Sequence, residues 1–472
     1  MIENISKKYE KQKKFFNSGT SKSIQYRINS LKKLKKNISL NENEIINALK
    51  SDLGKSETET FFSEIALIYI EINLALKNVK RWSKKRKVSS SLINFLSSDY
   101  IIPEPYGVTL NISPWNYPFQ LSISPLIGAV AAGNTVILKP SEFSSKTSEI
   151  IKKIIENTFE KGHVDVILGG PKIGSKLLDF NWDYIFFTGS TNIGKIVAQK
   201  AAINLTPTTL ELGGKNPCIV DETANLKVAS KRIVFGKFLN CGQTCIAPDF
   251  ILVHESVKKD FTEKIIDRIK KIYNEDVENS ENYSRIINKK HFSRLMKLLE
   301  EDKIIYGGKN NPNSNFIEPT LIDGSNFNSS LMKEEIFGPI LPVVSYSNKD
   351  ELKKILDNYK DPLAFYIFSN DKKFSNELIK RYSFGGAAVN DTISQIVNHR
   401  LPFGGIRNSG LGSYHGKQSF KTFSFYKPYI VKSNIFDLNA KYKIDSSSII
   451  YKLLKRSEEH TSELQSLTNL VC

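Results

Sequence analysis

The 472-residue sequence has few cysteines and no long apolar run. Four cysteines are too few for a disulfide scaffold, and no two have the CxxC spacing of a metal site: Cys218, Cys241, Cys245 and Cys472. No segment approaches the roughly 18 consecutive apolar residues of a membrane span, and the N-terminus lacks an apolar signal core. We therefore expect reduced thiols, no metal and a cytoplasmic protein.

The sequence also lacks a known nucleic-acid module, although its formal net charge is +18. A basic surface binds phosphate backbones without specificity, so the charge alone is compatible with nucleic-acid binding. The lysines, however, are spread along the chain and alternate with apolar positions at helical spacing. Solvated lysine faces explain this pattern better, and we expect no nucleic-acid partner.

The sequence differs from a P-loop motif at one position. Residues 189–195 fit the GxxxxGK pattern, but Ile196 follows instead of the Ser or Thr that binds magnesium, which disfavours an NTPase. The segment follows an apolar run and opens a helical pattern, so Gly189, Ser190 and Gly194 are candidates to bind a cofactor phosphate at a helix N-terminus. A glycine turn without a ligand is the alternative.

From residue 107 onward, short apolar runs alternate with helix-length segments, after a first hundred residues with helical periodicity. This alternation is typical of doubly wound parallel sheets, in which ligands bind beyond the carboxyl ends of the strands. One series of runs precedes Pro217 and another follows it, so we predict an α/β fold with two large domains. The predicted strands lie within 108–112, 135–139, 164–168, 184–187, 209–212, 251–256, 303–308, 318–323, 339–346, 363–370 and 385–391.

Glu211 and Cys245 each lie in a glycine-marked turn and are the candidate catalytic pair. A cysteine attacks carbonyl carbon as the thiolate, and a carboxylate can activate water to release the captured group. Glu211 closes the first series of strands and Cys245 belongs to the second. We therefore expect the site to lie in a cleft between domains.

Three further segments carry candidate ligand contacts. Asn116 lies between two prolines after a strand, where its amide is a candidate donor to an oxyanion. Lys139 and Glu142 end another strand and are candidates to bind ribose hydroxyls, with a surface ion pair as the alternative. Glu335 and Phe337 are candidates for a second ribose and a flat ring, with a helix end as the alternative.

The ordered segments PWNYP, KPSE, FTGSTNIGK, LELGGKNP, GQTC, EEIFGP and LPFGGIRNSG together resemble the aldehyde dehydrogenase superfamily over about residues 52–429. DLGKSETETFFSEI, KNPCIVD, GQTCIAPDF, VNDTI and SYHGKQSFKTFS resemble its class 3 and fatty aldehyde branch. The resemblance implies two Rossmann-like domains, for cofactor and catalysis, and a small bridging arm that serves oligomerisation. The implied divisions are 1–209 with part of the arm near 98–106, 210–395, and a return segment with the arm over 396–455.

The resemblance also implies NAD(P)-dependent oxidation of medium- or long-chain aliphatic, or aromatic, aldehydes to acids by a homodimer. Cys245 matches the nucleophile that forms a thiohemiacetal and then an acyl thioester, Asn116 the oxyanion donor and Glu211 the base for hydrolysis. The matching cofactor contacts are Lys139 and Glu142 at the adenosine ribose, Gly189, Ser190 and Gly194 at the pyrophosphate, and Glu335 and Phe337 at the nicotinamide side.

Two positions depart from the branch: Cys241 replaces a small residue, and Arg407 near the substrate mouth leaves the substrate preference open. Glu142 favours NAD over NADP, since its charge repels a 2′-phosphate. Two other functions stay open at this point, a CoA-acylating reductase on the same fold and a non-catalytic cofactor-binding protein.

Residues 456–472 resemble the translation of a sequencing-library adaptor, and we exclude them from the fold. The natural C-terminus is then expected to be missing. Peripheral membrane association is expected only through that missing part, although the basic stretch 441–456 fits an anionic surface or a solvated tail.

Overall fold

The computed structural model describes residues 2–90, 97–300, 302–324, 326–435, 442, 451–452 and 455–456. The chain divides into two compact units. The first comprises residues 1–82 and 104–425, and the second comprises 83–103 and the chain from 426 onward. Of the excluded segment 456–472, residues 457–472 lie outside the described residues, as does most of the basic stretch 441–456.

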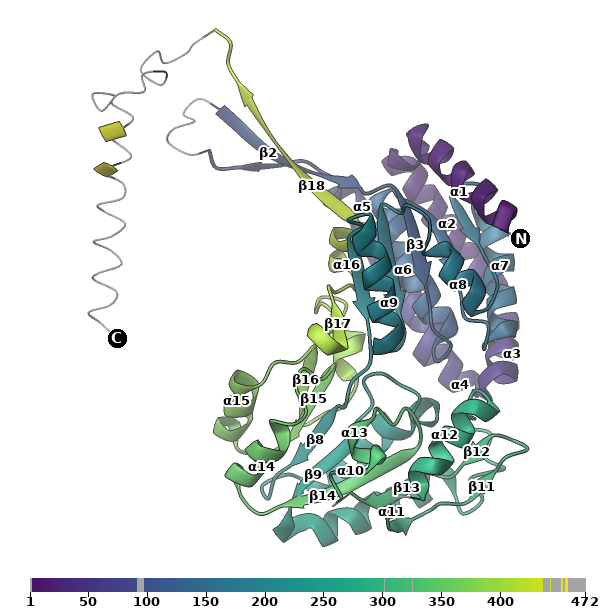
Figure 1. The fold of residues 1–472 in the computed structure, drawn as a ribbon, viewed down its shortest axis with the longest axis vertical. Helices are drawn as coiled ribbons and strands as arrows, with labels where there is room; N and C mark the ends of the chain where they lie inside the picture. The colour runs from purple at the N-terminus through teal and green to yellow at the C-terminus, as the bar shows by residue number, and fades with distance from the viewer. Residues whose placement is uncertain are drawn as a thin grey trace. The chain divides into compact units, whose positions relative to one another are not determined.

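Six strands of the first unit form one sheet in the order β17-β7-β6-β3-β4-β5 (Figure 1). All neighbours in this sheet are parallel except β17, which pairs with β7 in the antiparallel direction. The strands are β3 (Val108–Ile112), β4 (Thr135–Lys139), β5 (Val164–Val166), β6 (Tyr184–Thr188), β7 (Thr208–Glu211) and β17 (Gly410–Leu411).

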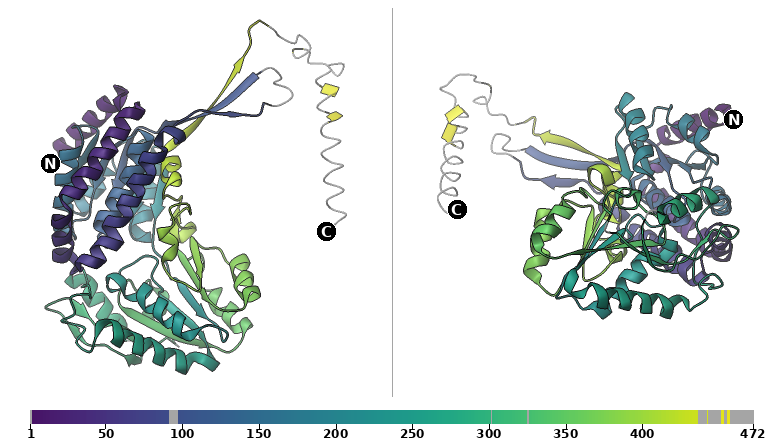
Figure 2. Two further views of the ribbon diagram at one scale, coloured as in Figure 1. Left: turned by 180° about the vertical axis from the view of Figure 1, so that it is seen from behind. Right: turned by 60° about the horizontal axis from the view of Figure 1, so that its bottom comes forward.

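Helices cover both faces of this sheet, as the alternation of side chains along each strand requires. In β6, Tyr184 and Phe186 pack into one hydrophobic cluster, whereas Ile185 and Phe187 pack into another. The first cluster contains residues of α2 (Ile24–Leu40), α5 (Ala66–Trp82), α6 (Pro118–Ala132) and α7 (Ser145–Thr158). The second contains residues of α1 (Ile2–Asn17), α8 (Pro171–Leu177) and α9 (Thr191–Ile203). α2 packs beside α5 and α7, as the view from behind in Figure 2 shows.

A second sheet of the first unit has the order β10-β13-β14-β9-β8-β15-β16 and is parallel except for β10. Its strands are β8 (Pro217–Val220), β9 (Phe250–His254), β10 (Ile304–Tyr306), β13 (Thr320–Asp323), β14 (Ile340–Tyr346), β15 (Ala364–Phe368) and β16 (Gly386–Val389). The accompanying helices are α10 (Leu226–Phe238), α11 (Lys258–Tyr273), α12 (Lys289–Leu299), α13 (Ser330–Lys333), α14 (Lys349–Leu356) and α15 (Lys372–Arg381). The ribbon β11 (Asn310–Asn311) with β12 (Phe316–Ile317) is separate.

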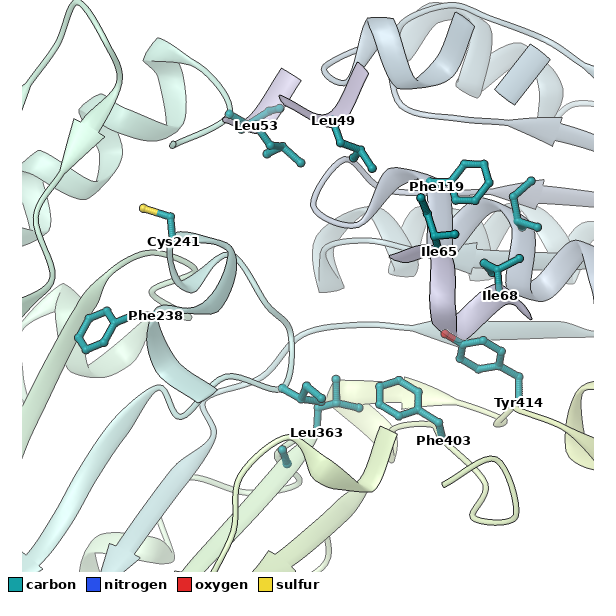
Figure 3. Packing of buried hydrophobic residues seen from close by; sticks show 14 of the residues in the cluster. Leu49, Leu53, Ile65, Ile68, Phe119, Phe238, Cys241, Leu363, Phe403 and Tyr414 are labelled. Atoms are coloured by element: carbon teal, nitrogen blue, oxygen red, sulfur yellow. The ribbon is translucent and has the colours of Figure 1, made fainter. Parts of the chain in front are cut away.

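One hydrophobic core joins the two sheets. Its buried members include Leu49 of α3 (Glu42–Leu53), Phe119 of α6 and Phe238 of α10, so it reaches from the N-terminal helices to the helices of the second sheet (Figure 3). α3 ends at Gly54, whose φ of 66° suits a glycine, as the Asp-Leu-Gly signal predicts. A short α4 (Glu57–Thr60) and a π-turn (Phe61–Ile65) then lead into α5.

The second unit contains a three-stranded sheet in the order β1-β2-β18. β1 (Arg86–Val88) pairs with β2 (Ser97–Pro105) in the antiparallel direction, and β18 (Ser424–Lys432) lies at the other edge. The helix α16 (Lys417–Thr422) precedes β18 within the first unit. The domain boundaries implied by the resemblance, at 209/210 and 395/396, stay a prediction.

The predicted α/β fold with parallel sheets is confirmed, and each predicted apolar run overlaps a strand. Several runs extend past their strands: for example, β5 ends at Val166 and β7 at Glu211, so Leu168 and Leu212 are not part of them. β7 ends there because its last register pair with β6 is Thr188–Glu211.

Candidate active site

Glu211, Cys245 and Asn116, from three separate segments, line one cavity of about 920 Å³ in the first unit. The loops after β3, β6 and β7 form one side, so the cavity opens at the carboxyl ends of these strands, as a parallel sheet predicts. The loop between α10 and β9 brings Cys245 to the same cavity.

Glu211 is the last residue of β7, and the return segment of the chain fixes its backbone. It lies opposite Gly410 of β17, and the Leu212 amide donates to the Ser409 carbonyl at 3.1 Å. Its side chain is only 3% exposed, and neither carboxylate oxygen has a hydrogen-bond partner among the described residues. Burial therefore raises the pKa of Glu211 well above its usual value.

Cys245 is half-buried at the cavity wall, and its carbonyl accepts a 2.7 Å hydrogen bond from the Asn216 side chain. Burial raises the pKa of this thiol to about 12, and the nearby carboxylates of Glu335 and Glu211 contribute further. The thiol is therefore protonated at pH 7. Its neighbour Cys241 is fully buried and donates from Sγ to Tyr283 Oη at 3.4 Å.

Asn116 lies in the loop between β3 and α6, with its side chain 3% exposed. Its Nδ2 donates to the Gln243 carbonyl at 3.0 Å, which links it to the loop of Cys245. An amide group has two N–H donors, so one remains for a ligand in the cavity.

The segment after β6 has the features of a phosphate site. Gly189 and Ser190 line the cavity at the N-terminus of α9, where helix amides favour an anion, and the buried Thr188 Oγ1 has no partner in the described structure. Gly194 lies inside α9 and does not line the cavity: a Cβ there would lie 2.5 Å from Leu212 Cδ2. It is a packing glycine that lets the helix approach the sheet.

Lys139 and Glu142 do not line this cavity. Lys139 Nζ lies 3.1 Å from Glu142 Oε2, with the lysine side chain 6% and the glutamate 28% exposed. Both side chains lie beside α8. A Cβ added at Gly174, within this helix, would lie 3.6 Å from Lys139 Cε, and one added at Gly170, just before the helix, would lie 4.0 Å from Glu142 Cγ. The pair is therefore a largely buried ion pair at the carboxyl end of β4.

Glu335 and Phe337 lie in the loop between α13 and β14, and both line the cavity. Burial raises the pKa of Glu335 to about 8, with a further contribution from Asp249. Gly213 makes room for this carboxylate, since a Cβ there would lie 2.0 Å from Glu335 Oε2. Phe337 has a φ of 51° and packs edge-on against Trp115, with ring centroids 5.4 Å apart.

These residues fit a dinucleotide cofactor: an uncapped helix N-terminus for phosphates and the carboxylate of Glu335 line the same cavity. Nothing in the described part of the chain groups three or more His, Cys, Asp or Glu side chains as a metal site would. Arg407 is 67% exposed, pairs with Asp361 at 2.5 Å and does not line the cavity.

The structure also brings to the site residues that the motifs did not reveal. The buried residues Lys55, Glu59 and Glu64 approach Asn116 and the Cys245 loop, and Asn240 lies between the two. Asp249 accepts a 3.0 Å bond from the Ile336 amide and so holds the Glu335 loop. A charged residue at a helical position that would face the core was the available signal for Glu59 and Glu64, whereas Lys55 lies between α3 and α4 and had no such signal.

The two parallel sheets and the cavity at their strand ends define an α/β enzyme with Rossmann-like domains. The model of the aldehyde dehydrogenase family matches residues 2–428, and the chain belongs to this family.

Three relatives and one solved structure support this assignment to the family. The chain is 48% identical to 4,4'-diaponeurosporen-aldehyde dehydrogenase of Staphylococcus aureus (strain NCTC 8325 / PS 47), over 91% of this chain and 94% of that protein. It is 42% identical to aldehyde dehydrogenase family 3 member A2 of Pongo abelii (89% and 86% covered) and to the dimeric NADP-preferring aldehyde dehydrogenase of Rattus norvegicus (92% and 95%). The substrate-bound structure of Staphylococcus aureus AldH superposes with a TM-score of 0.93 at 45% identity, covering 95% and 99% of the two chains.

The predicted membership of the class 3 branch is therefore confirmed, and the protein is an oxidoreductase that converts aldehydes to carboxylic acids. Within the described residues, every helix is too short or too polar to cross a membrane.

Proposed function

We propose that the protein oxidises medium- or long-chain aliphatic, or aromatic, aldehydes through a thioester on Cys245, with NAD as the favoured cofactor. The observation that carries this proposal is the unpartnered, buried carboxylate of Glu211 in the same cavity as the Cys245 thiol. A buried carboxylate without a partner is costly, and such groups cluster where chemistry needs a base.

In the first step, the Cys245 thiol loses its proton to solvent, and the thiolate forms a carbon–sulfur bond with the carbonyl carbon of the aldehyde while the carbonyl π electrons move to the oxygen. The free N–H of Asn116 Nδ2 and the backbone amide of Cys245 donate to that oxyanion. Bound nicotinamide supplies the acceptor for the hydride that leaves this carbon. An acyl thioester then remains on Cys245.

Glu211 acts in the second step. Because burial raises its pKa, its carboxylate is a stronger base than an exposed glutamate and takes a proton from water. The hydroxide oxygen bonds to the acyl carbon, the carbon–sulfur bond breaks, and the Cys245 thiolate leaves with the electron pair. The product is the carboxylic acid.

The cofactor is assigned to the residues beside the cavity. Ser190 and the Gly189 amide would hold the pyrophosphate at the N-terminus of α9, with Gly194 as the glycine that permits this approach. Lys139 and Glu142 would bind the adenosine ribose, and Glu335 with Phe337 the nicotinamide side. Glu142 favours NAD, because a carboxylate repels the 2′-phosphate of NADP.

The preference for apolar aldehydes follows from the cavity wall. Most of its surface is apolar, and at least three large side chains there keep much of their surface open: Phe62 at 39%, Phe235 at 47% and Val397 at 56%. Phe62 and Phe235 stack with ring centroids 6.2 Å apart. A long hydrocarbon chain would cover these groups, which gains about 25 cal/mol per Å² of apolar surface removed from water.

A homodimer formed through the second unit is part of the proposal. β18 lies at an edge of its three-stranded sheet and exposes Ile430 (54%) and Val431 (52%). Exposed apolar edge strands favour pairing with another chain. Light scattering at several concentrations should give twice the chain mass, and a Lys substitution at Ile430 should yield monomer.

We further propose a cytoplasmic location, since a nucleophilic thiol works where thiols stay reduced. Fractionation of cells that express the gene should place the activity in the soluble fraction.

Stopped-flow measurement of NADH absorbance tests the chemistry. Cys245→Ala should give no NADH, whereas Glu211→Gln should give a burst of about one NADH per site followed by turnover slowed at least about 100-fold. Hexanal, decanal and benzaldehyde with NAD and then NADP test the specificity. Equal steady turnover in the two variants, or acyl-CoA formation when CoA is added, would contradict the hydrolytic mechanism.

A further inference from the structure

Three segments far apart in the sequence meet at the backbone carbonyl of Asn116. Asn240 Nδ2 donates to this oxygen at 2.8 Å, and Lys55 Nζ donates to it at 3.2 Å. The Asn240 side chain also donates to the Gln243 carbonyl at 3.2 Å. Since Asn116 Nδ2 donates to the same Gln243 carbonyl, these bonds close a ring between the Asn116 loop and the Cys245 loop.

Glu59 holds Asn240 from the opposite side. One oxygen of its buried carboxylate accepts a 2.8 Å hydrogen bond from the backbone N–H of Asn240. The other oxygen accepts a 3.1 Å hydrogen bond from the Ser284 hydroxyl. The carboxylate therefore connects α4 with the turn that precedes Cys245.

The turn at Asn240 is strained. Asn240 (φ 53°, ψ 35°) and Cys241 (φ 55°, ψ 32°) are successive non-glycine residues in the left-handed region. Such a conformation is unfavourable for residues other than glycine and persists only where the surroundings impose it, which is common at active sites. Asn tolerates this conformation better than most residues.

We propose that Glu59 and Asn240 are positioning residues that set the separation between the two oxyanion donors, the Asn116 amide and the Cys245 backbone N–H. This inference rests on the proposed function, which assigns Asn116 its donor role. Asn116 follows β3 of one sheet, whereas Cys245 precedes β9 of the other, so the two donors have no common element that would fix their distance. The Glu59–Asn240 pair holds the turn that precedes Cys245 and so supports the direct bonds between the two loops, Asn116 Nδ2 to the Gln243 carbonyl at 3.0 Å and Tyr117 Oη to Thr244 Oγ1 at 2.6 Å.

The test replaces Asn240 by glycine. This variant keeps the left-handed backbone and removes the side-chain amide that donates to the Asn116 and Gln243 carbonyls. We expect kcat and kcat/KM for hexanal to fall roughly 10- to 100-fold, because misplaced donors stabilise the oxyanion poorly. The KM for NAD should stay unchanged. The rate at which methyl methanethiosulfonate modifies Cys245 should stay within about twofold, because that reaction has no oxyanion.

The matched control is Cys241→Gly, which removes the adjacent buried side chain of the same turn but no contact to Asn116. It is expected to keep kcat within about twofold. Where Asn240→Gly does not fold, Asn240→Asp replaces it, because an ionised carboxylate cannot donate to the two carbonyls.

A second pair of variants tests Glu59. Glu59→Gln retains an acceptor for the backbone N–H of Asn240 and a polar partner for the Ser284 hydroxyl, so it should keep most of the turnover. Glu59→Ala removes both and should lose turnover as Asn240→Gly does, again with unchanged thiol modification.

Asn116→Ala separates the two proposals. If it leaves kcat unchanged, the donor role under the proposed function is wrong. If it slows turnover but Asn240→Gly and Glu59→Ala do not, the positioning inference alone is overturned. Equal losses of turnover, thiol modification and NAD binding in Asn240→Gly would also overturn it, since they indicate general damage.

Discussion

The ammonium of Lys55 lies 2.5 Å from Glu64 Oε1, and both side chains are completely buried. The other oxygen of Glu64 accepts the amides of Phe119 and Gln120 at 2.9 and 3.1 Å, at the N-terminus of α6. Lys55 also donates to the Asn116 carbonyl. One buried ion pair thus ties the N-terminal helices to the loop that carries a proposed catalytic amide.

Breaking this pair should cost much stability. In Lys55→Met the Glu64 carboxylate stays buried without its counter-ion, which typically costs about 3–5 kcal/mol. Urea unfolding, followed by tryptophan fluorescence, measures the change. The control is Lys153→Ala, which breaks a 2.6 Å pair with Glu44 whose side chains are about half exposed, and should cost less than about 1 kcal/mol. A Lys55→Met variant within 1 kcal/mol of wild type would refute the assigned strength.

The charge of Glu335 should control the reactivity of Cys245 in alkaline solution. After burial, Glu335 is the largest contributor to the raised pKa of the thiol, and its own pKa is about 8. The negative charge is therefore absent well below pH 8 and present above it. Glu335→Gln should react like wild type at pH 6.5 and faster above pH 8, about tenfold for each unit by which the pKa of Cys245 falls.

Modification by methyl methanethiosulfonate from pH 6.5 to 9.5, measured by intact mass, follows this reactivity. Cys245→Ser provides the background from other thiols. Identical pH profiles for wild type and Glu335→Gln would show that the two groups are not coupled.

His415 should make the fold sensitive to acid. Burial lowers its pKa from an ordinary 6.5 to about 4, so below pH 6.5 the unfolded chain binds a proton that the native state excludes. Stability is thus lost as pH falls from about 6.5 towards 4. His415 has a φ of 84°, which Asn also tolerates, so His415→Asn preserves the backbone.

Between pH 6 and 5, His415→Asn should flatten the fall of the unfolding free energy by up to about 1.4 kcal/mol per pH unit. Urea titrations give this slope. The difference at pH 8, where the imidazole is neutral in both states, isolates the packing cost. Parallel curves for the two proteins would exclude the titration of His415 as a cause.

Glu142 should set the choice between NAD and NADP. Glu142→Gln removes the charge that would repel a 2′-phosphate, so the ratio of kcat/KM for NADP to that for NAD should rise about tenfold, equivalent to about 1.4 kcal/mol. Glu156→Gln, at a 58% exposed carboxylate on α7, is the matched control. An unchanged ratio, or an equal change in the control, would contradict the assignment.

Local patterns were sufficient where a segment is buried on both sides. The strands 108–112 and 135–139 match β3 and β4 to the residue, because each is a continuous run of β-forming side chains between turns. β17 has two residues, Gly410 and Leu411, and exists only because Glu211 and Leu210 lie opposite them. No local pattern predicts such a bridge.

Some residues of the candidate site could likewise be predicted from local patterns, and others could not. Glu211, Cys245 and Asn116 follow from residue type and turn context, and the structure places all three at one cavity. The helical position of Glu59 signals only a buried charge, and Asn240 has no local signal, since nothing along the chain indicates that a carboxylate 181 positions earlier accepts the Asn240 backbone N–H.

The sequence by itself determined the alternation of strands and helices, the reactive residue types and the glycines that permit close backbone approach, because these depend on side-chain chemistry and on neighbours along the chain. Only the tertiary structure decided which buried charges face one another and how far Asn116 lies from the loop of Cys245. Those relations join residues on different sheets, and burial, which raises the pKa of Glu211 and of Cys245, exists only once the sheets have packed.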